Sequence, residues 1–445
     1  MSEQQSTRII SPELEDTICL KVAVDMGVKK WVLGLSDGKN ATYRNIAARD
    51  LDAFHAEIKR TREHFGLPED IPAVMVYEAG RDGFWLSRHL KDLGEYAYVV
   101  DAASIMRPRK RKNKTDKLDA KLMLKALSRW MLGDGDAWSV VEVPTPLVED
   151  MRRLSRELNQ LKKEVNQQAS RIESALIRHG ITQWIGPCLL DKLDDMVGLD
   201  GRALGPCERN EIERIYERMS LAIEQAHEVR RAMIDVSRRA AQELGWDIPK
   251  RKLYFAYHRS RLPENDQQEQ RRKQREANRM DRINDSFDQM RAQDHEQFLT
   301  LFKMVIEGAM ARGIGLSSSY ESVFEYHWRP LRNRNQMSAA TGLAPVSDVT
   351  GIQDADRSDG ISKQARNRWR ALQIQLAWAH VRFQPNSAIT KLFKRRYANG
   401  NKRYRRIGIV MVARKLSVSM YQYHHKGTPP TGMVFNKLPV DKPAQ

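Results

Sequence analysis

The stretch Lys114-Thr115-Asp116-Lys117-Leu118-Asp119-Ala120-Lys121 is the part of the chain from which the fold can be worked out in both directions. Asp116 and Asp119 are three residues apart, so a helix would place both carboxylates on one face, one turn apart. Two like charges so close repel each other unless a cation lies between them, and oxygen ligands favour a divalent metal. The pair therefore predicts a metal site, or more simply a solvated helix start at which the helix dipole stabilises acids.

A strongly basic run, residues 107–114, comes immediately before these acids. Acids that can hold a metal, next to cations that can hold phosphate, favour chemistry on nucleic acid. The cations of this run that we expect to contact nucleic acid are Arg107, Arg109, Lys110, Arg111, Lys112 and Lys114.

Upstream of the basic run, β-branched and apolar segments alternate with amphipathic ones. They predict strands at residues 17–25, 31–36, 41–46, 71–78 and 96–100, and helices at 51–65 and 84–93. With the helix that carries Asp116, the order is β-β-β-α-β-α-β-α, which is the order of the RNase H-like fold.

Asp25 and Glu78 end the first and fourth of these strands, which are neighbours in an RNase H-like sheet. We therefore expect Asp25, Glu78, Asp116 and Asp119 to converge and to hold Mg²⁺, two ions in each active site. Two such ions can activate a nucleophile and stabilise the leaving oxygen in phosphodiester chemistry. The plain alternative for each strand-end acid is that it starts a turn.

Composition supports a nucleic-acid partner. The chain has 445 residues, enough for two or three domains, and a formal net charge of +18, which suits a polyanion. No apolar run reaches the length of a membrane span, and residues 1–12 are polar, so a cytoplasmic protein without a membrane partner is expected. Three cysteines without CxxC spacing and without a nearby His cluster argue against structural zinc and against a disulfide framework.

A long helix is predicted at residues 144–180. Its apolar residues keep a 4-3 spacing typical of a coiled-coil seam, and the simplest interpretation is a dimerisation or spacer element. A second helical stretch is expected from about Glu208 to Leu244, and residues 249–295 predict a charged, solvated helix or a partly disordered insertion. The seam consists of Leu147, Met151, Leu154, Leu158, Leu161, Val165 and Ile172.

From about Phe298 the chain is globular again and mostly helical, with a second cationic region. Such clusters suit phosphate contact and carry no sequence readout by themselves. The whole chain is thus predicted as α/β plus α, with domains at residues 1–140, 144–300 and 301–445. The cations expected to bind nucleic acid in this region are Lys363, Arg366, Arg368, Arg370, Arg395, Arg396, Arg405 and Arg406.

Several motifs together resemble the transposases of the insertion-sequence-110 family, the Piv/MooV-like DEDD recombinases, over nearly the whole chain. Lys-Thr-Asp-x-x-Asp after a basic strip, with Gly-Ile-Ser-Lys far downstream, is the most distinctive combination. The matching segments are Val22-Ala23-Val24-Asp25, Tyr77-Glu78-Ala79, Lys114 to Ala120, Gly342-Leu343-Ala344-Pro345, Gly360-Ile361-Ser362-Lys363 with Asn367-Arg368, and Arg405 to Val410.

The resemblance implies an N-terminal RuvC-like domain with a DEDD tetrad (Asp25, Glu78, Asp116 and Asp119), a coiled coil, and a C-terminal transposase domain. It also implies site-specific recombination between donor and target DNA, directed by a structured guide RNA from the element's own non-coding end, called a bridge or seek RNA. The implied assembly is a homo-oligomer: a dimer through the coiled coil, and a tetramer when two duplexes recombine.

One position departs from the family pattern. The family's nucleophilic serine stands just before a glycine, a few residues after Gly-Leu-x-Pro, where this chain has Val349-Thr350-Gly351. Threonine keeps the hydroxyl but adds a methyl group that crowds attack and restricts χ1. We expect Thr350 to be the nucleophile, with Ser347 in reserve. The alternatives are that the hydroxyl chemistry is lost and that Thr350 is an ordinary turn residue.

Three functions remain open from the sequence. The first is an RNA-guided DNA recombinase. The second is a RuvC-like, metal-dependent junction nuclease, which needs the acids but not Thr350. The third is a catalytically inactive, transposase-derived nucleic-acid-binding protein, which the altered nucleophile position favours and the full set of acids opposes.

Overall fold

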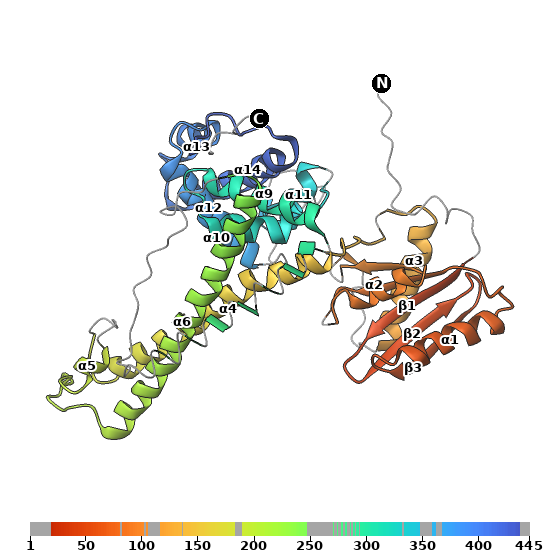
Figure 1. Cartoon of the computed structure of the whole chain (residues 1–445), viewed down its shortest axis with the longest axis horizontal. Coiled ribbons are helices and arrows are strands. Elements are labelled where there is room, and N and C mark those ends of the chain that lie inside the picture. Colours follow the sequence, from red (N-terminus) through yellow and green to blue (C-terminus); the bar gives the residue numbers. More distant parts are fainter. Residues whose placement is uncertain are drawn as a thin grey trace. The chain divides into compact units, whose positions relative to one another are not determined.

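The computed structural model of the chain describes residues 19–80, 82–101, 104–105, 116–135, 137–182, 189–246, 294–331, 333–347, 358–361 and 367–436, and isolated positions between 270 and 292. The chain forms two compact units, Met1–Pro144 and Thr145–Gln445 (Figure 1). In the part described, no helix is both long enough and apolar enough to cross a membrane.

A five-stranded mixed sheet forms the first unit. Its strand order is β3-β2-β1-β4-β5, with antiparallel pairing among β1, β2 and β3 and parallel pairing of β4 with β1 and β5. The predicted sequence of five strands and three helices is confirmed, with boundaries shifted by a few residues. The elements are β1 (Leu20–Met26), β2 (Lys30–Ser36), β3 (Ala41–Ala47), α1 (Leu51–His64), β4 (Ala73–Glu78), α2 (Trp85–Asp92), β5 (Tyr96–Val100) and α3 (Asp116–Met131).

Local chemistry explains why these elements begin and end where they do. The side chain of Asp37 accepts hydrogen bonds from the backbone N–H groups of Lys39 and Asn40 (2.8 and 2.5 Å), and Gly38 has a positive φ of 97°, so the chain turns back between β2 and β3. Asp50 caps α1 by accepting from Ala53 N–H at 2.9 Å.

Both faces of the sheet are covered by helices. Side chains alternate along a strand, so Leu20, Val22 and Val24 of β1 pack with residues of α1 and α2 on one face. Ala23 of β1, with Val74 and Val76 of β4, packs with α3 on the other. Alternate residues of each strand therefore pack against the helices on opposite faces of the sheet.

The second unit is built on two long helices, α4 (Pro146–Ile177) and α6 (Pro206–Glu243), which lie side by side (Figure 1). The predicted helices at 144–180 and 208–244 are thus confirmed. The short helix α5 (Leu189–Leu193) packs at the end of this pair, where Ile172 and Tyr216 belong to a small apolar cluster.

Shorter helices complete the second unit. They pack against α4 and α6, and around the C-terminal helix, to form two larger apolar clusters. These elements are α9 (His295–Met310), α10 (Leu316–Ser322), the π-helix η3 (Val323–His327), α11 (Arg334–Ala340), β6 (Pro345–Ser347), β7 (Ser358–Ile361), α12 (Asn367–Phe383), α13 (Ala388–Tyr397) and α14 (Lys402–Lys426).

The apolar stripe of α4 is buried within a single chain. Leu147, Met151, Leu158 and Leu161 belong to one cluster with residues of α6 and α9. The sequence pattern predicts a dimerisation or spacer element, and α6 and α9 of the same chain already cover the stripe. Dimerisation through this seam stays a prediction, and the stripe no longer requires it. The predicted insertion at 249–295 lies mostly outside the described residues.

A buried histidine in the second unit predicts a pH-dependent stability. His380 of α12 is 1% exposed, and its Nε2 lies 2.8 Å from the hydroxyl of Ser387, which caps α13. Because that hydroxyl donates to Thr390, Nε2–H of His380 is the donor, and Nδ1 has no partner among the described residues. Burial lowers the pKa of His380 from 6.5 to about 4.

We expect His380 to stabilise the fold fully above its unfolded pKa of about 6.5 and progressively less as the pH falls toward its folded pKa. The unfolded chain binds the proton more readily in that window, so this one group lowers the free energy of unfolding by about 2 kcal/mol between pH 7.5 and pH 5. Urea denaturation of wild type and His380→Gln at both pH values measures the effect. An equal pH dependence in the two proteins would contradict it.

Candidate active site and nucleic-acid interface

The backbones of Asp25 and Glu78 lie next to each other at one edge of the sheet. β1 and β4 are parallel, with Val24 opposite Tyr77, so the following residues, Asp25 and Glu78, also lie side by side. Side chains two residues apart on a strand lie on the same face of the sheet. Asp25 is two residues from Ala23, and Glu78 is two residues from Val76, and both of these pack with α3. The side chains of Asp25 and Glu78 therefore lie on the face that α3 covers. The predicted neighbourhood of these two acids is therefore present.

Helix α3 carries the other two acids over the same face. It crosses β2 closely, because a Cβ added at Gly34 would lie 3.5 Å from the carbonyl oxygen of Ala120. The carboxylate of Asp116 pairs with the ammonium group of Lys30 on β2 at 3.4 Å, with both side chains about half exposed. Lys30 lies two residues from Val32 on β2, so the two side chains share one face of the sheet, and Val32 pairs with Asp25. The first turn of α3 therefore lies at the strand ends where Asp25 is found.

Lys30 is a neighbour of the acids that sequence reasoning missed. It lines an open hollow together with Val32, Tyr43, Asp116 and Lys117. Its ion pair with Asp116 is exposed to solvent and contributes little stability. The two-residue spacing from Val32 along β2 was the sequence signal that could have placed it on this face.

The donor chemistry of the four acids fits magnesium, since carboxylate oxygens are its usual protein ligands. The four side chains are not gathered round one point, however. Among the residues that the structure describes, no three His, Cys, Asp or Glu side chains lie close enough together to hold a metal ion. The structure thus brings the supporting elements together, and the four-carboxylate metal site stays a prediction.

The expected nucleophile, Thr350, lies outside the described residues. Ser347 ends β6, and its backbone pairs with Ser358 of the antiparallel strand β7. The segment that contains Thr350 is therefore flanked by two strands that pair with each other.

The predicted cations divide into three groups. Arg107, Arg109, Lys110, Arg111, Lys112, Lys114, Lys363 and Arg366 lie outside the described residues. Arg368 and Arg370 point to partners within the chain: Arg370 donates to the carbonyl oxygen of Gly342 at 3.2 Å, and Arg368 joins the ion-pair network below. Arg395, Arg396, Arg405 and Arg406 are exposed.

The exposed cations gather where α13 ends and α14 begins. The rings of Tyr397 and Tyr404 lie 4.9 Å apart, so the two helix ends are close together. Tyr404, which is 45% exposed, offers an aromatic surface among the charges. The cations of this α13–α14 basic surface are Lys394, Arg395, Arg396, Lys402, Arg403, Arg405 and Arg406.

The start of α14 is electrostatically unusual for a helix. Its first turn holds no acid and several cations, although the positive end of a helix dipole disfavours cations there. Asn401 caps the helix by accepting from Tyr404 N–H at 2.9 Å. Cations added to a helix N-terminus lower the stability of the isolated fold but provide a strong site for phosphate. This surface therefore suits a polyanion.

Removing charge from this surface should weaken DNA binding. We expect the double variant Arg405→Gln/Arg406→Gln to bind duplex DNA about tenfold more weakly in physiological salt, and to lower the slope of log K against log salt by about 2, because each phosphate contact contributes roughly 0.9. Fluorescence anisotropy over a salt series measures both. Lys415→Gln, an exposed lysine farther along α14, is the matched control and should bind like wild type. An unchanged salt slope in the double variant would rule this surface out.

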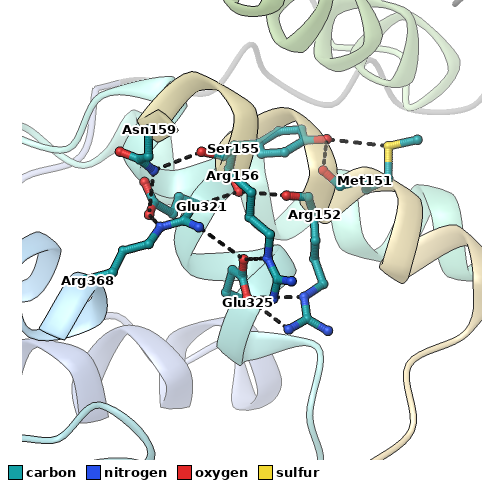
Figure 2. A network of polar contacts seen from close by, with 9 residues as sticks. Met151, Arg152, Ser155, Arg156, Asn159, Glu321, Glu325 and Arg368 are labelled. Carbon is teal, nitrogen blue, oxygen red and sulfur yellow. Dashed lines mark hydrogen bonds and ion pairs between the residues drawn. The ribbon is translucent and has the colours of Figure 1, made fainter. Parts of the chain in front are cut away.

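A buried acid with three arginines joins α4, η3 and α12 (Figure 2). Glu325 is 0% exposed and accepts hydrogen bonds from Arg152 at 3.1 Å and from Arg156 at 2.7 and 2.9 Å. Arg368 lies 3.8 Å from the same carboxylate and pairs with Glu321 at 2.8 Å. Burial alone would raise the pKa of Glu325, but the Arg156 hydrogen bond and the three positive charges together lower it.

This network changes the interpretation of Arg368. The sequence suggested a phosphate contact, whereas its guanidinium group also donates to the hydroxyl of Ser155 at 3.2 Å and is only partly exposed. Sequence reasoning missed Glu325 itself. An acid in the otherwise apolar run Val323-Phe324-Glu325-Tyr326 was the signal that could have indicated a buried, paired carboxylate.

Comparison with known proteins identifies one informative relative. The chain is 30% identical over 428 residues to the Sinorhizobium fredii (strain NBRC 101917 / NGR234) protein named "Putative transposase y4rJ", a match that covers 93% of each chain. No family model matches the sequence.

Proposed function

This chain belongs to the family of that Sinorhizobium fredii protein, and on that premise we propose that it is the transposase of an insertion sequence, which cleaves and exchanges DNA strands. The relative's name refers to a transposase, and the match extends over both of the compact units. A basic chain with an exposed cationic surface at α13 and α14 suits a DNA substrate.

The observation that carries the proposal is the position of Asp25 and Glu78 at adjacent ends of β1 and β4, beneath α3. The strand order β3-β2-β1-β4-β5 supports an RNase H-like, RuvC-like catalytic domain. We propose that these two acids, with Asp116 and Asp119, hold magnesium. The bound metal would activate the attacking oxygen and stabilise the leaving oxygen of a phosphodiester. Lys30, paired with Asp116, would limit the repulsion among the acids before the metal binds.

The second half of the composite site would be a hydroxyl group on the segment between β6 and β7. Thr350 is our choice of nucleophile and Ser347 the reserve. In this step the hydroxyl oxygen forms a bond to the scissile phosphorus and the bond from phosphorus to the departing sugar oxygen breaks. The hydroxyl proton passes to solvent, and the departing sugar oxygen takes a proton from solvent to become a hydroxyl group. The product is a covalent protein–DNA phosphodiester.

Replacement of the hydroxyl tests this half of the site. Thr350→Ala should trap no covalent protein–DNA adduct and exchange no strands, whereas Thr350→Ser should keep both activities because it keeps the hydroxyl and removes the methyl group. Denaturing gels of reactions with labelled element ends measure the adduct. Strand exchange by Thr350→Ala at the wild-type rate would exclude this residue. Nicking without exchange in every variant would favour the junction nuclease.

We further propose that the transposase is guided by an RNA from the flank of its element and works as a tetramer. The family resemblance supports both points. The guide RNA can be tested by purifying the protein in moderate salt from cells that carry the gene with its flanking DNA. The RNA that stays bound to the protein is then sequenced. One discrete RNA from that flank is expected. A heterogeneous mixture would indicate unspecific binding to polyanions and favour the inactive binder.

A further inference from the structure

A cationic cavity lies between α4 and α6. Its volume is about 140 Å³, well above the roughly 10–15 Å³ that one water molecule needs. The polar side chains among its lining all contain nitrogen, and no lining residue is acidic. The lining residues are Lys162, Val165, Asn166, Ile223, Ala226, His227 and Arg230.

The cavity forms where two apolar clusters of the α4–α6 pair meet. Val165 packs against both clusters, and Ala226, with its small side chain, faces it from α6. A larger apolar side chain at position 226 would fill the space between α4 and α6. The small side chain leaves space at the point where Lys162 enters from α4.

Lys162 is the unusual member of the lining. It is only partly exposed, and the described residues offer its ammonium group no hydrogen bond or ion pair. Burial lowers its pKa, as do the nearby charges of Arg230 and Arg368, while Glu321 opposes them. Partial burial of an unpaired ammonium group beside other cations destabilises the folded protein, and a bound anion would offset that cost by pairing with the ammonium group.

The surrounding charges strengthen this inference. Arg368 and Glu321, which influence Lys162, belong to the Glu325 network, where Arg152 and Arg156 also lie. Glu321 and Glu325 pair with Arg368, Arg152 and Arg156, and the charge of Glu321 offsets the effect of burial and of the nearby arginines on Lys162 only in part. The region therefore holds more positive than negative charge.

We propose that this α4–α6 cavity binds a phosphate group, with Lys162, Asn166 and Arg230 as its contacts. Asn166 is exposed at the rim, and an amide N–H₂ and a guanidinium group are both suited to phosphate oxygens. The phosphate can come from the backbone of a bound nucleic acid, which would add a contact to the proposed function, or from a free phosphate or nucleotide. Binding of the phosphate group does not depend on strand exchange.

The test uses the full-length protein and inorganic phosphate or pyrophosphate in a buffer without other polyvalent anions. Calorimetry should give a dissociation constant at least tenfold higher for Lys162→Gln than for wild type. Lys163→Gln, its exposed neighbour on α4, should bind like wild type. Without phosphate, the melting temperature of Lys162→Gln should equal or exceed that of wild type, which shows that the variant folds. Equal phosphate affinity in wild type and Lys162→Gln, or no binding to wild type, would overturn the proposal.

A salt series with DNA or RNA separates the two sources. If the cavity takes a backbone phosphate, Lys162→Gln lowers the slope of log K against log salt by about 1. If it takes a free phosphate or nucleotide, the slope is unchanged while phosphate binding is lost. Either result supports the phosphate site. Neither result requires that the protein exchange strands, so the phosphate site can be confirmed even if the proposed transposase function is wrong.

Discussion

Asp25→Asn should abolish strand cleavage and exchange and leave DNA binding intact. The substitution keeps the shape of the side chain, so β1 should keep its pairing with β2 and β4. It removes the negative charge that a divalent metal needs from this ligand. We expect the rate to fall at least 10³-fold, equivalent to about 4 kcal/mol in the activation free energy.

Cleavage of labelled element ends in magnesium, measured beside anisotropy binding, would separate the two effects. Asp37→Asn is the matched control. It makes the same change in the same unit, and the amide oxygen can still accept from the N–H groups of Lys39 and Asn40. It should react like wild type. Wild-type rates from Asp25→Asn would remove this strand end from the catalytic site, and an inactive Asp37→Asn would mean that loss of charge disables the unit generally.

Glu325→Ala should strongly destabilise the second unit. It leaves the guanidinium group of Arg152, which is 5% exposed, buried without the carboxylate it pairs with at 3.0 Å. Breaking a buried pair by removing one partner typically costs about 3–5 kcal/mol. Arg156 and Arg368 lose the same partner, so three segments that are far apart in the sequence lose their shared contact.

Urea denaturation at neutral pH measures the loss, with Glu296→Ala as the control. Glu296 is exposed in the first turn of α9, so its removal should change the free energy of unfolding by less than about 0.5 kcal/mol. Because the pKa of Glu325 is lowered in the folded state, its contribution is present above the unfolded pKa of about 4.3 and is lost as the pH falls below it. Wild-type stability in Glu325→Ala would show that the pair is not coupled to folding.

The acids illustrate how far the sequence leads. Strand ends at Asp25 and Glu78 and a helix start near Asp116 follow from local alternation and turn signals, which act over a few residues. The pairing of β1 with β4 then follows from the order of the elements. The ion pair of Lys30 with Asp116 does not, because it depends on where α3 crosses β2.

The long helix shows the opposite case. Its 4-3 stripe is visible in the sequence, but a stripe states only that one face must be buried, not against what. The structure buries it against α6 and α9 of the same chain. A partner chain and a partner helix leave the same periodicity in the sequence, so only the tertiary contacts decide between them.

By itself, the sequence determined the order of strands and helices, the two long helices, the strand-end positions of Asp25 and Glu78, and a cationic surface suited to nucleic acid. These depend on local periodicity and on net charge. Only the tertiary structure decided that Arg368 turns inward to Glu321 and Glu325, that Arg152 meets an acid 173 residues away, and that Lys162 lines a cavity. Such contacts depend on how distant segments pack, and no local pattern records them.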